Sequence, residues 1–188
     1  HITPGKKIVI LLGSIFLVFL YAHWQSICSF YVINDDVRQQ IYWMQQWQDQ
    51  SLYQDHYLTN YARRYVPWGV QALYWCAAPF FNPLLFGKIL TCLLFCTTGG
   101  LLFLLMRRLG DDLSGILSVC LYFYFGFFLG AMSGGLSRGF VFPLMILYLI
   151  CICHNKLLSA ALVVMVQSFF NPYLFVLCCS IHFLYLIS

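Results

Sequence analysis

The chain alternates between long apolar runs and short polar segments, and the lengths of the apolar runs lead to the first prediction. About 20 consecutive apolar residues are needed for a helix to cross a lipid bilayer. Runs that reach or approach this length predict membrane-spanning helices at residues 8–33, 84–106, 113–130, 139–153 and 157–188. The dipeptide Asn171-Pro172 interrupts the last run, because proline cannot donate a helical hydrogen bond. Residues 157–188 therefore form either one kinked helix or two short helices.

The long polar segment, residues 34–78, has a helical pattern of its own. One face of its first part carries Val37, Ile41, Met44 and Gln48, and a neighbouring face carries Trp43 and Trp47. A narrow apolar stripe beside aromatic side chains is typical of a helix that lies in the membrane interface. Tyrosines at four-residue spacing predict a second short helix over residues 52–65, and the apolar piece 67–78 is too short to span. We therefore expect an outer loop with interfacial helices.

The composition favours a membrane protein. Hydrophobic residues make up 62% of the chain and charged residues 9%, with a mean hydropathy of +0.80. A soluble domain carries about 25% charged residues. We expect an all-α fold, a polytopic transmembrane helix bundle that forms a single domain over residues 1–188. Lys6 and Lys7 before the first run, and Arg107-Arg108 after the second, predict a cytoplasmic N-terminus and place residues 34–78 outside the cytoplasm.

The composition also argues against several classes of function. The net charge of +4 is small, and no basic run of the kind that binds nucleic acid is present. The nine cysteines lie almost entirely within apolar runs and lack metal-binding spacing, so we expect packing roles for them rather than disulfides, metal sites or redox chemistry. The chain ends inside an apolar run, and we therefore expect it to be the N-terminal part of a longer protein.

Two adjacent carboxylates, Asp35 and Asp36, stand where the first apolar run meets the polar segment. The chain has six acidic residues, all of them Asp, so a pair at one point is unusual. A helix cap needs one Asp and stabilises a helix by about 1 kcal/mol. Two neighbouring carboxylates disfavour each other's ionisation unless a cation or metal lies nearby. The pair is therefore a candidate general base, or a ligand for a substrate or a metal ion.

Further candidate residues are predicted on the same side of the membrane. They are Arg138 in a Gly/Ser-rich turn, Arg63, Asp55, His56 and Asn171. The two arginines either snorkel to lipid headgroups or bind a phosphate through the planar guanidinium. The Asp-His pair either belongs to a solvated turn or helps to position an acceptor or a metal ion. We expect the asparagine to face the same cavity as the Asp pair if the last helix is broken.

The chain resembles uncharacterised bacterial polytopic proteins of the C-type (GT-C) membrane glycosyltransferase superfamily. The similar motifs are Asn34-Asp35-Asp36-Val37-Arg38-Gln39-Gln40, Tyr42-Trp43-Met44, Pro67-Trp68-Gly69, Leu136-Ser137-Arg138-Gly139-Phe140-Val141-Phe142-Pro143-Leu144 and Phe169-Phe170-Asn171-Pro172. The order of features is similar as well: a first helix that ends at an Asp pair, a long outer loop with interfacial helices, and a bundle of apolar helices. Members of the superfamily usually have more helices, and often a C-terminal soluble domain.

The resemblance implies transfer of a sugar from a polyprenyl-phosphate-linked donor to an acceptor hydroxyl, at the extracytoplasmic face of a bacterial inner membrane. Asp35 or Asp36 would be the catalytic base, and Arg138 would stabilise the departing lipid phosphate. Membrane lipid, the donor and an acceptor would be the partners. Some members also use a divalent metal, so a divalent metal is a candidate cofactor here.

Two other functions fit parts of the pattern. A transporter or flippase for a lipid-linked or small polar substrate would need charges or broken helices near the middle of the membrane. Gln167 and Asn171-Pro172 are the features that fit this requirement. A non-catalytic membrane scaffold would have no need of paired acids in its outer loop. The glycosyltransferase hypothesis accounts for the Asp pair.

Overall fold

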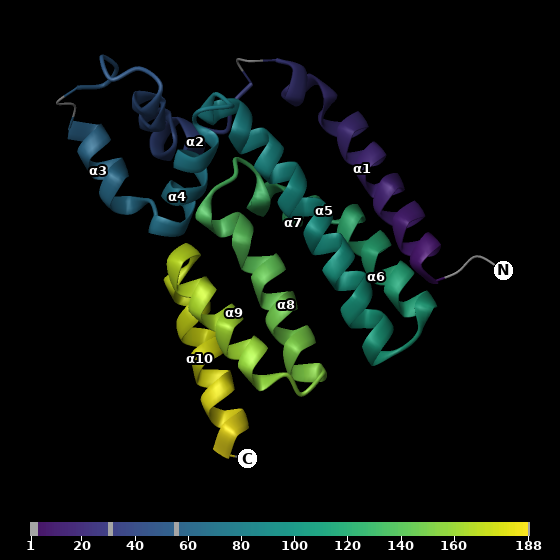
Figure 1. The fold of residues 1–188 in the computed structure, drawn as a ribbon. Coiled ribbons are helices and arrows are strands. Elements are labelled where there is room, and N and C mark those ends of the chain that lie inside the picture. Colours follow the sequence, from purple (N-terminus) through teal and green to yellow (C-terminus); the bar gives the residue numbers. More distant parts are fainter. Residues whose placement is uncertain (1–3, 30–31, 55–56, 188) are drawn as a thin grey trace.

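The computed structural model describes residues 4–29, 32–54 and 57–187, and this part of the chain is helical without any strand (Figure 1). In chain order the elements are α1 (Pro4–Cys28), α2 (Asp35–Gln40), η1 (Tyr42–Trp47), α3 (Tyr57–Tyr65), α4 (Trp68–Ala77), α5 (Pro83–Leu109), α6 (Asp112–Tyr124), α7 (Gly126–Met132), η2 (Ser137–Phe140), α8 (Val141–Cys153), α9 (Leu157–Phe170) and α10 (Pro172–Ile187). The two η elements are 3-10 helices. The all-α prediction is confirmed.

Helix α5 is the scaffold of the fold, because it packs against α1, α6 and α8. Its start follows from local chemistry: the Asn82 side chain accepts the N–H of Leu84 at 2.9 Å, and Pro83 occupies the first turn, where its missing N–H costs nothing. The Phe95 ring of α5 stacks on Tyr122 of α6 with ring centroids 4.7 Å apart. This helix covers the segment predicted at residues 84–106.

The long helices place their connections at two ends of the molecule. Figure 1 shows the start of α1, the α5–α6 connection and the α8–α9 connection at one end. The short elements α2, α3 and α4, the turn before η2 and the α9–α10 break lie at the other end. The basic residues of the last turn of α5 belong to the first end. The candidate site residues in the described part of the chain belong to the second.

Helices α8, α9 and α10 form a second layer with its own buried cluster, which includes Tyr148, Val164 and Cys178. The open question about residues 157–188 is decided here: the chain forms two helices that meet at Asn171. The Asn171 side chain accepts the N–H of Leu174 at 3.0 Å and so caps α10.

The prediction of one continuous helix over residues 113–130 is wrong. The helix breaks at Phe125, whose backbone is extended, and α6 and α7 are bent by 70°. Glycine follows the break, and glycine supports a helix poorly. Packing accounts for the direction of α7, because the bend brings Met132 beneath α6, where the Tyr122 hydroxyl donates to its sulfur at 3.2 Å.

Three predicted boundaries also need correction. The helix predicted at residues 8–33 ends at Cys28, and residues 32–34 are not helical. The first interfacial helix is a short α-helix followed, after Ile41, by a 3-10 helix. The second begins at Tyr57 rather than residue 52, since the described residues before it form turns and Tyr53 has a positive φ of 56°.

Among the residues that the structure describes, α5 is the one continuous helix that is long and apolar enough to cross a membrane. The bent α6–α7 pair passes the same test if it counts as one span. Helices α9 and α10 are apolar and shorter, as is the combined η2–α8 segment.

Candidate functional site

An ion pair joins α2 to η2. The Arg138 guanidinium lies 2.6 Å from the Asp36 carboxylate, and the side chains are 43% and 38% exposed. Both partners are thus reachable from outside while held in a defined position. One of the two candidate bases, Asp36, is thus in direct contact with Arg138, the predicted phosphate ligand.

The two carboxylates of the Asp pair differ in their surroundings. The Asp35 side chain is 88% exposed, and its contact is a 3.8 Å approach to Arg38 one turn further along α2. Such an exposed pair contributes roughly 0–1 kcal/mol. The geometry therefore separates two residues that the sequence left equivalent, and it favours Asp36 as the functional carboxylate.

Asn34 fixes the start of α2 and ties it to the facing turn. Its side-chain oxygen accepts the N–H of Asp36 at 2.9 Å, and its side-chain nitrogen donates to the Ser133 hydroxyl at 2.7 Å. One side chain thus both caps the helix and joins two distant segments. This double contact holds the Asp36 backbone close to the turn that carries Arg138.

The turn itself requires two glycines. Gly134 and Gly135 have φ values of +90° and +63°, a region that side-chain-bearing residues rarely adopt. A Cβ on Gly134 would lie 2.5 Å from Val37 of α2, and one on Gly135 would lie 2.7 Å from the Tyr74 hydroxyl. The turn therefore packs directly against α2 and α4.

The Tyr74 side chain of α4 holds the Gly134-Gly135 turn in place. Its hydroxyl lies 3.3 Å from the carbonyl oxygens of both Gly134 and Gly135 and donates to them. The side chain is 1% exposed, and burial raises the pKa of the phenol above its usual value because the charged form loses its hydration. The tyrosine thus remains a neutral donor and fixes the backbone that leads to Arg138.

Asp36 also lines a cavity of about 700 Å³, here called the tyrosine pocket. Its walls are Asp36, Arg38, Gln39, Gln40, Tyr42, Tyr53, Leu58, Tyr61, Ala62 and Tyr65. The rings of Tyr61 and Tyr65 are stacked with centroids 5.9 Å apart. The candidate base therefore faces a space with aromatic walls and planar polar side chains.

Among the described residues, Arg63 and Asn171 are not brought to the Asp36–Arg138 pair. Arg63 lies over the Trp43 ring, with 5.2 Å between the guanidinium carbon and the ring centroid, and it lines cavities that Asp36 does not line. The oxygen of the Asn171 side chain is used as a helix cap. Asp55 and His56 lie outside the described residues.

A metal ligand set of three or more His, Cys, Asp or Glu side chains is not found within the described part of the chain. Sequence reasoning missed Ser133 and Tyr74, which hold the site together. The Gly-Gly dipeptide indicated the turn, but no local pattern shows which residue packs beneath it.

A scan against protein-family models and searches of curated proteins and of solved structures found no match to this chain.

Proposed function

We propose that this chain is a membrane glycosyltransferase of the GT-C type, in which Asp36 is the general base and Arg138 binds the phosphate of a polyprenyl-phosphate sugar donor. The observation that carries the proposal is the 2.6 Å contact between these two side chains. A base and a phosphate-binding cation are the two groups that such a transfer needs, and their contact gives them one shared site. The resemblance of the segments around both residues to that superfamily is the second support.

The proposed chemistry follows from the two groups. The acceptor hydroxyl gives its proton to the Asp36 carboxylate while its oxygen attacks the anomeric carbon of the sugar. The bond between that carbon and the phosphate oxygen breaks with inversion, and the bonding electrons leave with the lipid phosphate. The Arg138 guanidinium stabilises the negative charge that develops there.

The ion pair also suggests what state the two side chains have before a substrate binds. Without a donor, the Asp36 carboxylate and the Arg138 guanidinium neutralise each other. A phosphate that takes over the guanidinium in a bidentate contact weakens its hold on the carboxylate. The carboxylate is then available to the acceptor hydroxyl, for which the tyrosine pocket offers space.

The proposal includes a polytopic arrangement in the membrane. Helix α5 and the bent α6–α7 pair have the length and apolar character required. The basic residues at the end of α5 lie at the end of the bundle opposite to the Asp36–Arg138 pair (Figure 1), as expected for a cytoplasmic end. The pair then lies at the outer surface, at the depth of the headgroup of a lipid-linked donor.

The test is sugar transfer from labelled polyprenyl-phosphate donors in membranes that contain the expressed protein. We expect transfer by the parent protein and its loss in Asp36→Asn and Arg138→Gln at matched expression. The Asp111→Asn variant is the control, because Asp111 caps α6 through Ser114 at the other end of the bundle. Absence of transfer with every donor tried would overturn the proposal.

A transporter or flippase is the second candidate, and the helix breaks at Phe125 and Asn171 favour it. Gln167, near the second break, is fully buried, and its side-chain oxygen has no partner in the described structure. Broken helices and buried polar groups are typical of transport sites. Movement of an intact lipid-linked sugar across vesicles, undiminished in Asp36→Asn, would favour this candidate over the transferase.

A further inference from the structure

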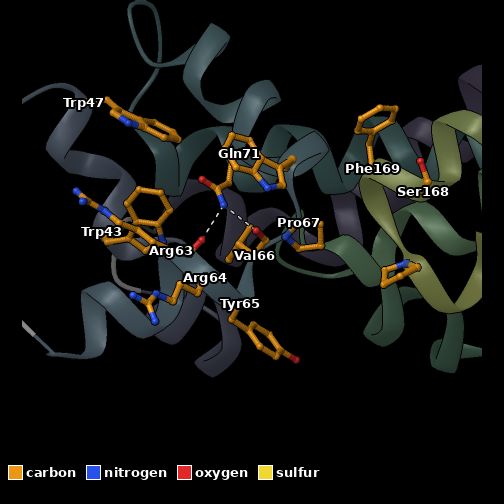
Figure 2. Close-up of a pocket in the computed structure, with 12 residues that line it drawn as sticks. Trp43, Trp47, Arg63, Arg64, Tyr65, Val66, Pro67, Gln71, Ser168 and Phe169 are labelled. Carbon is orange, nitrogen blue, oxygen red and sulfur yellow. Dashed lines mark hydrogen bonds between the residues drawn. The ribbon is translucent and has the colours of Figure 1, made fainter.

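A second cavity, of about 890 Å³, lies between the α3–α4 corner and the end of α9, and is here called the Trp–Arg pocket. Figure 2 shows Trp43, Trp47 and the two arginines on one side of it, and Ser168 and Phe169 of α9 on the other. Neither Asp36 nor Arg138 lines it. We propose that this pocket binds an amphiphilic phosphate, with the phosphate at Arg63 and Arg64 and the alkyl chain against Trp68 and Phe169.

The charge of the pocket favours an anion. Arg63 and Arg64 are consecutive residues in the last turn of α3, and both line the pocket, whereas none of its lining residues is acidic. Phosphate oxygens match the planar guanidinium, which can donate two parallel hydrogen bonds to them. Two guanidinium groups beside one cavity therefore form an anion site with no internal counter-charge.

Hydrogen bonds reduce the partial negative charge near the end of α3. Carbonyl oxygens at a helix C-terminus carry partial negative charge and would normally repel one. Here the Gln71 side chain donates to the carbonyl oxygens of Arg63 and Val66, at 2.9 and 2.7 Å (Figure 2). These two oxygens are satisfied within the protein, which lessens their repulsion of an anion bound at the arginines.

Arg63 is held in place before any ligand binds. Its guanidinium lies over the Trp43 ring and donates to the Gln46 side chain. A preorganised cation loses little side-chain entropy when it binds a ligand. Trp43 is 2% exposed, and its indole N–H has no acceptor in the described structure. This buried donor belongs to the ring that the Arg63 guanidinium covers.

The apolar wall explains why an amphiphile fits better than free phosphate. Trp68 is 80% exposed and Phe169 is 58% exposed, although both line the pocket. The two walls are fixed relative to each other, because a Cβ on Gly69 would lie 2.8 Å from the Phe169 carbonyl oxygen. An alkyl chain laid between them removes apolar surface from water, at about 25 cal/mol per Å².

The tryptophans provide the measurement, since three of the five in the chain line the pocket: Trp43, Trp47 and Trp68. The protein is held in dodecyl maltoside, and its tryptophan fluorescence is followed during titration with decyl phosphate. Parallel titrations use inorganic phosphate and neutral decyl maltoside. We expect a saturable change with decyl phosphate, weaker binding of inorganic phosphate by at least about tenfold, and no saturable change with the neutral detergent.

Variants distinguish binding of decyl phosphate in this pocket from its general electrostatic attraction to a positively charged protein. We expect Arg64→Gln, and more strongly the Arg63→Gln, Arg64→Gln double variant, to weaken decyl phosphate binding about tenfold or more. Arg64→Lys keeps the charge and should recover part of the affinity. Arg108→Gln removes one exposed arginine at the far end of α5 and should leave the affinity unchanged. Equal weakening by Arg108→Gln, or none in the double variant, would overturn the site.

The source of the phosphate is decided by the same titrations. Inorganic phosphate that binds as tightly as decyl phosphate would overturn the amphiphile assignment, because the apolar wall would then contribute nothing. The proposal does not depend on the glycosyltransferase hypothesis. Loss of sugar transfer in Asp36→Asn and weaker binding of decyl phosphate in Arg64→Gln are independent outcomes.

Discussion

Asp36 precedes the central helix α5 in the sequence and Arg138 follows it, yet their side chains lie 2.6 Å apart. Both are partly exposed, so the pair contributes roughly 0–1 kcal/mol to stability. The ion pair itself therefore does little to stabilise the fold. Other interactions hold the two side chains close together: the two hydrogen bonds of the Asn34 side chain, and the hydrogen bond from the buried Tyr74 hydroxyl to the Gly135 carbonyl oxygen.

Arg138 should affect transfer far more than folding. If its guanidinium stabilises the leaving phosphate, Arg138→Gln should lower kcat/KM by about 10²–10³-fold, as loss of one charge-stabilising group does elsewhere. The kcat/KM of Arg138→Lys should lie between those of the parent and of Arg138→Gln, because lysine keeps the positive charge but cannot make the bidentate contact of a guanidinium. The measurement is steady-state transfer beside a thermal unfolding curve. A fall in unfolding temperature that accounts for the lost activity would contradict this role.

Gly135 should be intolerant of any side chain. An alanine there adopts φ +63° and places its Cβ within 2.9 Å of the Gly87 carbonyl oxygen and 2.7 Å of Tyr74. Left-handed strain and overpacking together predict a loss of about 2–4 kcal/mol. Detergent-solubilised protein would be compared by thermal unfolding.

Gly130→Ala is the matched control for Gly135→Ala. Gly130 lies within α7, and an added Cβ there meets nothing within 4 Å. Alanine in a helix is more favourable than glycine by up to about 1 kcal/mol, so this variant should be as stable as the parent or more so. Equal destabilisation by both substitutions would show that the turn is not specially constrained.

Tyr74→Phe should weaken the turn and change the response to alkali. Loss of the hydroxyl removes the hydrogen bonds to Gly134 and Gly135, a cost of about 1 kcal/mol at neutral pH. Burial raises the pKa of Tyr74 in the folded state above its usual value of 10.0. The stability gained by keeping the phenol neutral is full below that value and is lost as the pH rises above it.

The parent should therefore lose stability above about pH 10 more steeply than Tyr74→Phe. Unfolding midpoints in denaturant, measured from neutral pH into alkali, give the comparison. Parallel curves for the two proteins across this range would show that Tyr74 ionises equally in the folded and unfolded chain, which its burial argues against.

Much of the fold can be predicted from local sequence patterns. The start of α5 was predictable because Asn82-Pro83 combines a capping side chain with a proline that suits a first turn. The break between α9 and α10 was visible as Asn171-Pro172, although the choice between a kink and two helices needed the structure. The break at Phe125 was missed, because packing of Met132 and Phe128 against other helices determines it and no proline marks it.

The candidate site divides in the same way. Asp36 and Arg138 stood out because charged residues are scarce in this chain and both occur at the ends of apolar runs. Their contact, and the exposed position of Asp35, could not be read from sequence because they depend on pairing between distant segments. Arg63 was grouped with Arg138 by residue type alone, and the structure assigns it to a different cavity.

The most direct test of the central claim compares Asp35→Asn with Asp36→Asn, two neighbouring substitutions that remove the same charge. Sugar transfer from a labelled polyprenyl-phosphate donor would be measured in membranes with matched amounts of each protein. Because Asp36 alone contacts Arg138 and the tyrosine pocket, Asp36→Asn should lower transfer by about 10²–10⁴-fold while Asp35→Asn retains most of it. Equal effects of the two substitutions, or retained transfer in Asp36→Asn, would contradict the assignment of Asp36 as the base.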